Sequence, residues 1–185
     1  MLKQKMHREG KAMQARYTGS VPFDPWLTAA FLGLTVELDS TLKTNDDEET
    51  YAVLDYEQKR IRYSNFYGPT FSIWAIACEI GKYIAISQHG LKQYTPTVFA
   101  REFDTDADIA GDAFAEALLI SDEVIENCLI GNDLVHLARA HCVTVGRLKR
   151  YVEKHKLLDR VKANEAKRLN VPVEYMRVHD EYRFK

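Results

Sequence analysis

At the centre of the chain stands the stretch Ile76-Ala77-Cys78-Glu79-Ile80-Gly81-Lys82-Tyr83. It lies in a run from Phe71 to Ser87 that is apolar on nearly every side, a pattern typical of a helix buried in a hydrophobic core. Gly90 follows the run and is expected to end the helix. The sequence therefore predicts a buried central helix that carries two charged residues, Glu79 and Lys82.

The composition is that of an ordinary globular protein. The 185 residues are 46% hydrophobic and 28% charged, with a formal net charge of -2, so the chain as a whole is not a polycation that seeks nucleic acid. The three cysteines, Cys78, Cys128 and Cys142, are few and scattered, as expected in a reducing cytoplasm. No apolar run approaches the length of a membrane helix. We therefore expect a cytoplasmic protein that makes no membrane contact.

Local patterns predict an α+β fold with a small antiparallel sheet, a buried central helix and a helical C-terminal half. Asp24 is expected to cap a helix from Pro25 to about Leu32, which Gly33 would end. Strands are expected at 34–42, 51–56 and 60–64, and the short link between the last two fits an antiparallel hairpin. Further helices are expected at 109–119, 122–131, 134–142 and 146–156.

Charge is distributed unevenly along the chain. Residues 1–21 are basic and no apolar segment of a secretory signal follows them, so we expect a loose, partly helical N-terminal arm. Residues 102–126 are acidic and contain no Lys or Arg, and the chain is basic again from Arg139 onward. Residues 159–185 are expected to form a C-terminal extension with a short extra helix and an extended end.

The central stretch looks like a zinc motif that has lost its ligands. In zincin-like metallopeptidases, His-Glu-x-x-His on a helix places two imidazoles on one face, where they share a zinc ion. The Glu of that motif lies beside the metal-bound water as general base. Here the helix and the Glu are retained, while Cys78 and Lys82 stand where the two histidines would be.

Around this motif the chain resembles the ImmA/IrrE proteins, bacterial and phage regulators with a zinc metallopeptidase fold. The similar segments are Pro25 to Val36, the strands within Tyr51 to Ser64, Asp108 to Leu119, and the pairs Leu137-Ala138, Val143-Thr144 and Arg147-Leu148. The resemblance implies a zincin-like domain over residues 22–158. It also implies a regulatory role, because family members act on transcriptional repressors, often by cleaving them.

Only some of the family's zinc-site positions have a suitable residue in this sequence. Glu79 falls on the general-base position, and Cys78 falls on the first ligand position. Lys82 falls on the second, where an ammonium has no lone pair to offer a metal. Asp108 falls on the third, unless the register slips and Asp112 is the match. We therefore expect no cofactor, with zinc as the less favoured alternative, and an ammonium in place of the metal among these carboxylates.

Two other groups of reactive side chains carry less weight. Cys78 and His89 could form a nucleophile pair, but no third group is evident. A second possible metal site could be formed by Cys128, His136, His141 and Cys142. The two histidines are five residues apart and diverge on a helix, so buried packing is the favoured interpretation.

The segment 134–158 allows a separate interpretation. Two helices joined by a short turn at Cys142 to Thr144 resemble a helix-turn-helix, and the second helix is basic. Arg147, Lys149 and Arg150 would then contact phosphates or a partner. In the ImmA/IrrE proteins the same helix pair is a packing element of the peptidase domain, which argues against DNA binding.

The sequence favours a non-catalytic regulator, a pseudo-metallopeptidase that binds a helix-turn-helix transcriptional repressor. Such a protein would act as an antirepressor or adaptor of a phage or mobile element. One alternative is a metallopeptidase with an altered metal site, in which Glu79 would activate water. The other alternative is a DNA-binding regulator that uses the helices of residues 134–158.

Overall fold

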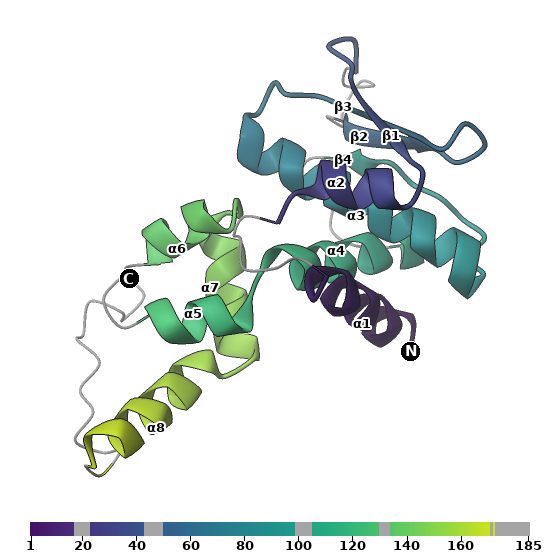
Figure 1. Cartoon of the computed structure of the whole chain (residues 1–185). Coiled ribbons are helices and arrows are strands. Elements are labelled where there is room, and N and C mark those ends of the chain that lie inside the picture. Colours follow the sequence, from purple (N-terminus) through teal and green to yellow (C-terminus); the bar gives the residue numbers. More distant parts are fainter. Residues whose placement is uncertain (17–22, 43–49, 99–104, 130–133, 171, 173–185) are drawn as a thin grey trace. The chain divides into compact units, whose positions relative to one another are not determined.

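The computed structural model describes residues 1–16, 23–42, 50–98, 105–129, 134–170 and 172 (Figure 1). The chain divides into two compact units, Met1–Leu119 and Ile120–Lys185. The expected boundaries of a zincin-like domain at residues 21/22 and 158/159 stay a prediction. The segment that resembles the ImmA/IrrE proteins extends over parts of both units.

Unit 1 is built around α3 (Pro69–His89), the expected central helix. This helix lies between a small sheet and α4 (Asp106–Leu119) (Figure 1). Twelve of its residues are buried, including Glu79 and Lys82. Gly90 ends α3 in the left-handed conformation, with φ of 71°, as the sequence predicts.

The sheet of unit 1 has the strand order β1-β3-β2-β4. Its strands are β1 (Thr35–Leu38), β2 (Thr50–Asp55), β3 (Arg60–Tyr63) and β4 (Thr97–Val98). The expected antiparallel hairpin is confirmed as β2 and β3. However, β1 pairs with β3 in parallel, so the sheet is mixed and the expectation of a wholly antiparallel sheet is corrected. The hairpin partner β3, rather than β2, lies next to β1, and because β3 runs opposite to β2 it has the same direction as β1.

A loose, partly helical arm was expected at the N-terminus, and the structure has a helix there that packs on unit 1. Helix α1 (Leu2–Gln14) lies against α4, and its Met6 side chain is completely buried. Gln14 Nε2 donates a hydrogen bond to the Leu118 carbonyl oxygen at 3.1 Å. Basic residues dominate the sequence of this segment, although its Met6 side chain packs into the core of unit 1.

The second N-terminal helix follows its sequence signals closely. Helix α2 runs from Pro25 to Phe31, and the Asp24 carboxylate caps it by accepting hydrogen bonds from the backbone N–H groups of Trp26 and Leu27. An acceptor at this position satisfies N–H groups that have no partner within the helix.

Helices α3 and α4 approach each other closely because glycine stands at their contact. A Cβ atom on Gly81 would lie 2.6 Å from Phe114 Cβ, and one on Gly111 would lie 2.9 Å from the Cys78 carbonyl oxygen. Both distances are too short for real side chains, so larger residues would push the helices apart. The close approach brings the first turn of α4, with Asp108, to the middle of α3.

Unit 2 is helical. Its described residues form α5 (Asp122–Cys128), α6 (Leu134–Ala140), α7 (Val145–Lys154) and α8 (Leu157–Leu169). The α8 helix is longer than the short extra helix that the sequence predicts, and the expected extended end lies outside the described residues. The α+β class and the helical C-terminal half are thus confirmed. Among the described residues, no helix is long and apolar enough to cross a membrane.

Candidate functional site

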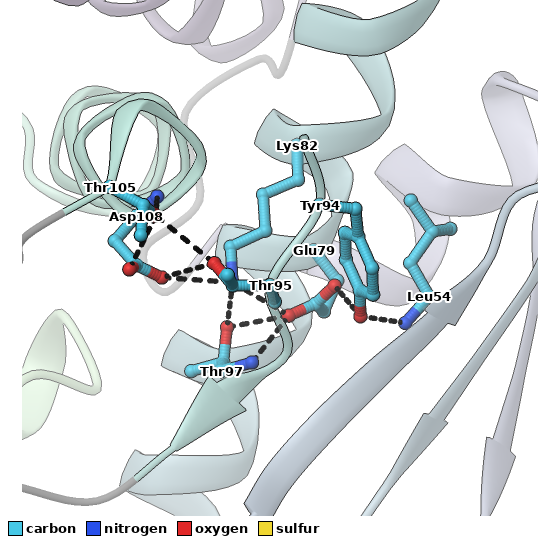
Figure 2. A network of polar contacts seen from close by, with 8 residues as sticks. All are labelled: Leu54, Glu79, Lys82, Tyr94, Thr95, Thr97, Thr105 and Asp108. Carbon is cyan, nitrogen blue, oxygen red and sulfur yellow. Dashed lines mark hydrogen bonds and ion pairs between the residues drawn. The ribbon is translucent and has the colours of Figure 1, made fainter. Parts of the chain in front are cut away.

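A network of polar side chains lies inside unit 1, where α3 faces β4 and the start of α4. Figure 2 shows its members. They are Glu79 and Lys82 on α3, Tyr94 and Thr95 after α3, Thr97 on β4, Thr105 and Asp108 at the start of α4, and Leu54 on β2. Because Glu79 and Lys82 are buried, their charged groups need partners within the protein, and this network supplies them.

Lys82 occupies the centre of the network, and only 1% of its surface is exposed. Its Nζ donates hydrogen bonds to Glu79 Oε1 at 3.1 Å, the Thr95 carbonyl oxygen at 2.8 Å and Thr97 Oγ1 at 2.9 Å. An ammonium has three donors, so these three acceptors match it completely. Asp108 Oδ1 lies 3.5 Å from the same nitrogen and adds a second carboxylate.

Glu79 is completely buried and its oxygens accept four hydrogen bonds. Oε1 accepts from Lys82 Nζ, from the Thr97 backbone N–H at 2.9 Å and from Thr97 Oγ1 at 2.6 Å. Oε2 accepts from Tyr94 Oη at 2.9 Å. Three of these bonds fall on Oε1 and one on Oε2, so both oxygens are bound by groups of the chain itself.

Asp108 joins the start of α4 to the segment that follows α3. Its Oδ2 accepts a hydrogen bond from Thr105 Oγ1 at 2.6 Å, and its Oδ1 accepts one from Thr95 Oγ1 at 3.1 Å. The Asp108 backbone N–H donates to Thr105 Oγ1 at 3.1 Å, so Thr105 also satisfies an N–H in the first turn of the helix. Each oxygen of this carboxylate therefore has a partner.

Tyr94 connects the network to the sheet. Its hydroxyl donates to Glu79 and accepts a hydrogen bond from the Leu54 backbone N–H at 2.6 Å. Its ring centroid lies 5.8 Å from Lys82 Nζ, within range of a cation–π interaction. Burial, followed by the negative charge of Glu79, raises the pKa of the Tyr94 phenol above its ordinary value of 10.0. The hydroxyl is therefore held as a donor.

Replacing Tyr94 with phenylalanine is expected to lower the free energy of unfolding by about 1–3 kcal/mol at neutral pH, because the Leu54 N–H loses its acceptor. The loss should shrink at alkaline pH. In the native chain the raised pKa keeps Tyr94 protonated above pH 10.0, while the unfolded chain ionises there, so stability falls as pH rises. The Phe variant lacks this contribution.

The measurement is urea denaturation of both proteins between neutral pH and pH values above 10.0, the ordinary pKa of the phenol. The other tyrosines and the lysines titrate in both proteins and cancel in the comparison. Above the ordinary pKa of the phenol, unfolding of the native protein should release one more proton per molecule than unfolding of the variant. Its free energy of unfolding should therefore fall more steeply with pH. If the free energies of unfolding of the two proteins differed by the same amount at all pH values, the raised pKa of Tyr94 would be contradicted.

Three of the residues predicted for the site are brought together, namely Glu79, Lys82 and Asp108. Cys78 is buried on α3, and Asp112 is half-buried one helical turn beyond Asp108. The basic residues Arg147, Lys149 and Arg150 lie on α7 in unit 2 and belong to no part of this network.

The weaker candidates are separate from the network. His89 Nε2 lies 3.5 Å from Glu9 Oε1, an ion pair only if the imidazole is protonated. His141 is completely buried, with Nδ1 2.8 Å from the Leu137 carbonyl oxygen. His136 lies on α6 and Cys142 in the turn after it, while the Cys128 side chain is outside the described residues.

Sequence reasoning missed Tyr94, Thr95, Thr97 and Thr105, which supply most of the hydrogen bonds. They lie in or beside the segment between α3 and α4, which has no periodic pattern. One signal was available: a lysine and a glutamate within an apolar helix require buried partners, and the polar run from Gln93 to Thr97 follows that helix directly.

The donor set does not fit the zinc ion that the resemblance implies. Within the described parts of the chain, no three His, Cys, Asp or Glu side chains converge on one point as metal ligands would. Glu79 and Asp108 face Lys82 Nζ, which carries a positive charge and no lone pair. We therefore derive no reaction step through a metal at this position.

Comparison with known proteins assigns no family. No protein-family model matches the chain, and no curated protein matches it. A solved structure described as a Mycobacterium tuberculosis transcriptional regulator matches the chain with 16% sequence identity and a TM-score of 0.47. The similarity covers 80% of this chain and 45% of that protein, so the chain spans less than half of that protein's length. A similarity at this level assigns no activity.

Proposed function

We propose that this chain is a non-catalytic regulator that binds a helix-turn-helix transcriptional repressor, as an antirepressor or adaptor. The proposal rests on the resemblance to ImmA/IrrE proteins together with the state of the central site. In such a protein the peptidase scaffold would be retained for binding, while its chemistry would be lost. A phage or mobile element is the expected setting.

The position of Lys82 is the observation that carries the proposal. Its ammonium lies 3.1 Å from Glu79 Oε1 and 3.5 Å from Asp108 Oδ1, between the carboxylates that the resemblance assigns to a general base and a third ligand. A positive charge there neutralises the carboxylates, as a metal ion otherwise would. The scaffold would then keep its arrangement without depending on a metal supply.

The hydrogen bonds of Glu79 count against the alternative of a metallopeptidase. A general base must have a lone pair directed at the water that it deprotonates. Both oxygens of Glu79 accept hydrogen bonds from groups of the chain itself, and the side chain is 0% exposed, so it has no contact with solvent. No contact in the described residues favours catalysis by this side chain.

The test is recovery of the partner from the native cell with the full-length chain as bait, followed by identification of that partner by mass spectrometry. The proposal expects an intact helix-turn-helix repressor. The purified repressor is then incubated with the chain, with added zinc in one arm and chelator in the other. It should stay full length in both arms. Cleavage that the chelator abolishes, or recovery of no repressor, would overturn the proposal.

A further inference from the structure

We propose that unit 1 binds a small organic phosphate in a cavity where α1, the end of α3 and the start of α4 meet. The cavity encloses about 710 Å³ and opens to solvent. Its lining comes from the first turns of α1, from residues 89–93 and from Thr105 and Asp106. This is a different site from the lysine–carboxylate network, and the proposal does not depend on repressor binding.

Packing within unit 1 fixes the walls of the cavity. Helix α1 lies close against α4, since a Cβ atom on Gly10 would lie 2.7 Å from Ala117 Cβ. After α3 ends at Gly90, the Leu91 backbone N–H donates a hydrogen bond to the Ala85 carbonyl oxygen at 3.0 Å, which fixes the direction in which the chain leaves the helix. A preformed cavity of roughly 300–1,000 Å³ is typical of small-molecule sites.

Two lysines give the cavity a positive charge. Lys5 lies on α1 and is half-buried, and Lys92 lies in the segment after α3 and is exposed. In the described part of the chain, neither ammonium has a hydrogen bond or an ion pair. Asp106 is the one carboxylate among the residues that line the cavity. Both ammoniums therefore keep their donors for a ligand, in contrast to Lys82, whose three donors are all used.

His89, the last residue of α3, also lines the cavity. Its Nε2 is buried and lies 3.5 Å from Glu9 Oε1 of α1, an ion pair when the imidazole is protonated. Glu9 itself does not line the cavity, and a protonated His89 balances its charge. The charge of the two lysines is then left for a ligand.

The charged groups of the lining favour a phosphate over other anions. A phosphate monoester carries about 1.5–2 negative charges at pH 7 and has three acceptor oxygens, so it can pair with two ammoniums at once. Lysine binds phosphate as a point charge, whereas the planar fork of arginine is the better match for a carboxylate. The residues that line the cavity include two lysines and no arginine.

The rest of the lining accommodates an organic group. Leu2 and Leu91 are half-buried and supply apolar surface, and the Gln93 amide can both donate and accept hydrogen bonds. The volume of about 710 Å³ is much larger than a phosphate group requires. We therefore infer a phosphate monoester with a partly apolar body rather than a free phosphate ion.

The cavity lies beside the lysine–carboxylate network and shares residues with it. Thr105 lines the cavity and donates a hydrogen bond to Asp108 at 2.6 Å. Gln93 also lines it and directly precedes Tyr94, which donates to Glu79. A ligand would thus contact the two segments that hold the network, and it should stabilise unit 1 because the cavity exists only in the folded chain.

The test adds the purified full chain to phenyl phosphate, in a buffer free of phosphate and sulfate, and follows the ³¹P resonance of the ligand. We expect saturable binding of one molecule per chain, with a dissociation constant on the order of 10⁻³ M for so small a ligand. Benzoate has the same ring and a single negative charge, and it should bind about tenfold more weakly. Phenyl phosphate should also raise the urea midpoint of unit 1.

Four variants locate the binding. Lys5→Met and Lys92→Met should each weaken binding about tenfold, because each removes a hydrogen bond to a charged group. Lys92 is exposed, so its replacement should leave the urea midpoint of the ligand-free chain unchanged. Lys3→Met removes the same charge from an exposed position of α1 outside the lining and should leave affinity unchanged. Asp106→Asn removes a carboxylate from the lining and should strengthen binding about threefold.

Absence of saturable binding by the native chain at about 10 mM phenyl phosphate, tenfold above the expected dissociation constant, would overturn the proposal. Equal affinity for benzoate and phenyl phosphate would also overturn it, as would equal losses in Lys3→Met and Lys92→Met. These measurements use the purified chain without a protein partner. A negative result therefore leaves the proposed repressor binding untouched, and failure to recover a repressor leaves the cavity untouched.

Discussion

Replacing Lys82 with methionine is expected to lower the free energy of unfolding of unit 1 by about 3–5 kcal/mol, the usual cost of removing one partner from a buried ion pair. Methionine has a similar length and no charge, so the loss does not come from a cavity. It leaves Glu79, which is 0% exposed, without its cation, and it leaves the Thr95 carbonyl oxygen without the Lys82 donor. Few surface substitutions have effects of this size.

The measurement is urea denaturation followed by tryptophan fluorescence. Both tryptophans, Trp26 and Trp74, lie in unit 1, so the signal reports that unit alone. Lys92→Met is the matched control, because Lys92 is exposed and should change stability by no more than about 0.5 kcal/mol. Equal stability of the Lys82→Met variant and the native chain would contradict the role assigned to this lysine.

A double variant tests whether the loss comes from an uncompensated charge. Glu79→Gln combined with Lys82→Met removes both members of the ion pair, and replacing a buried pair by neutral groups costs much less than removing one partner. The two losses should therefore be non-additive by about 0.5–3 kcal/mol, as expected for residues in direct contact. Strict additivity would show that the two side chains act independently.

Installing both missing histidines, Cys78→His with Lys82→His, is expected to produce a protein that binds one zinc ion per chain. The two positions are four residues apart on α3, so their side chains lie on one face of the helix. Removal of the ammonium would free Asp108, 3.5 Å from Lys82 Nζ, to serve as the third ligand. Zinc at about a hundred times its dissociation constant should then stabilise the variant by about 2.7 kcal/mol.

Metal analysis after purification with zinc, together with denaturation in the presence and absence of zinc, provides the measurement. The Cys78→His single variant is the control, because it retains the ammonium among the carboxylates and should take up no zinc. The native chain should also contain none. Stoichiometric zinc in the native chain would refute the interpretation of Lys82, and lack of zinc in the double variant would refute the zincin-like scaffold.

The sequence by itself determined the elements whose signals are local. Asp24 and Pro25 specify the start of α2, and Gly90 specifies the end of α3, because caps and terminators act on backbone groups a few residues away. The short link between β2 and β3 made their hairpin predictable for the same reason. The apolar run of α3 likewise indicated burial, and therefore that Glu79 and Lys82 needed partners.

Only the tertiary structure decided which residues are the partners of Glu79 and Lys82. Thr95 and Thr97 reach Lys82 because the chain turns back along α3 after Gly90. The local sequence around these two threonines does not predict that path. The same holds for the parallel pairing of β1 with β3, the packing of α1 on α4 and the division into two units. All of these depend on contacts between residues far apart in sequence, whereas patterns along the chain report only near neighbours.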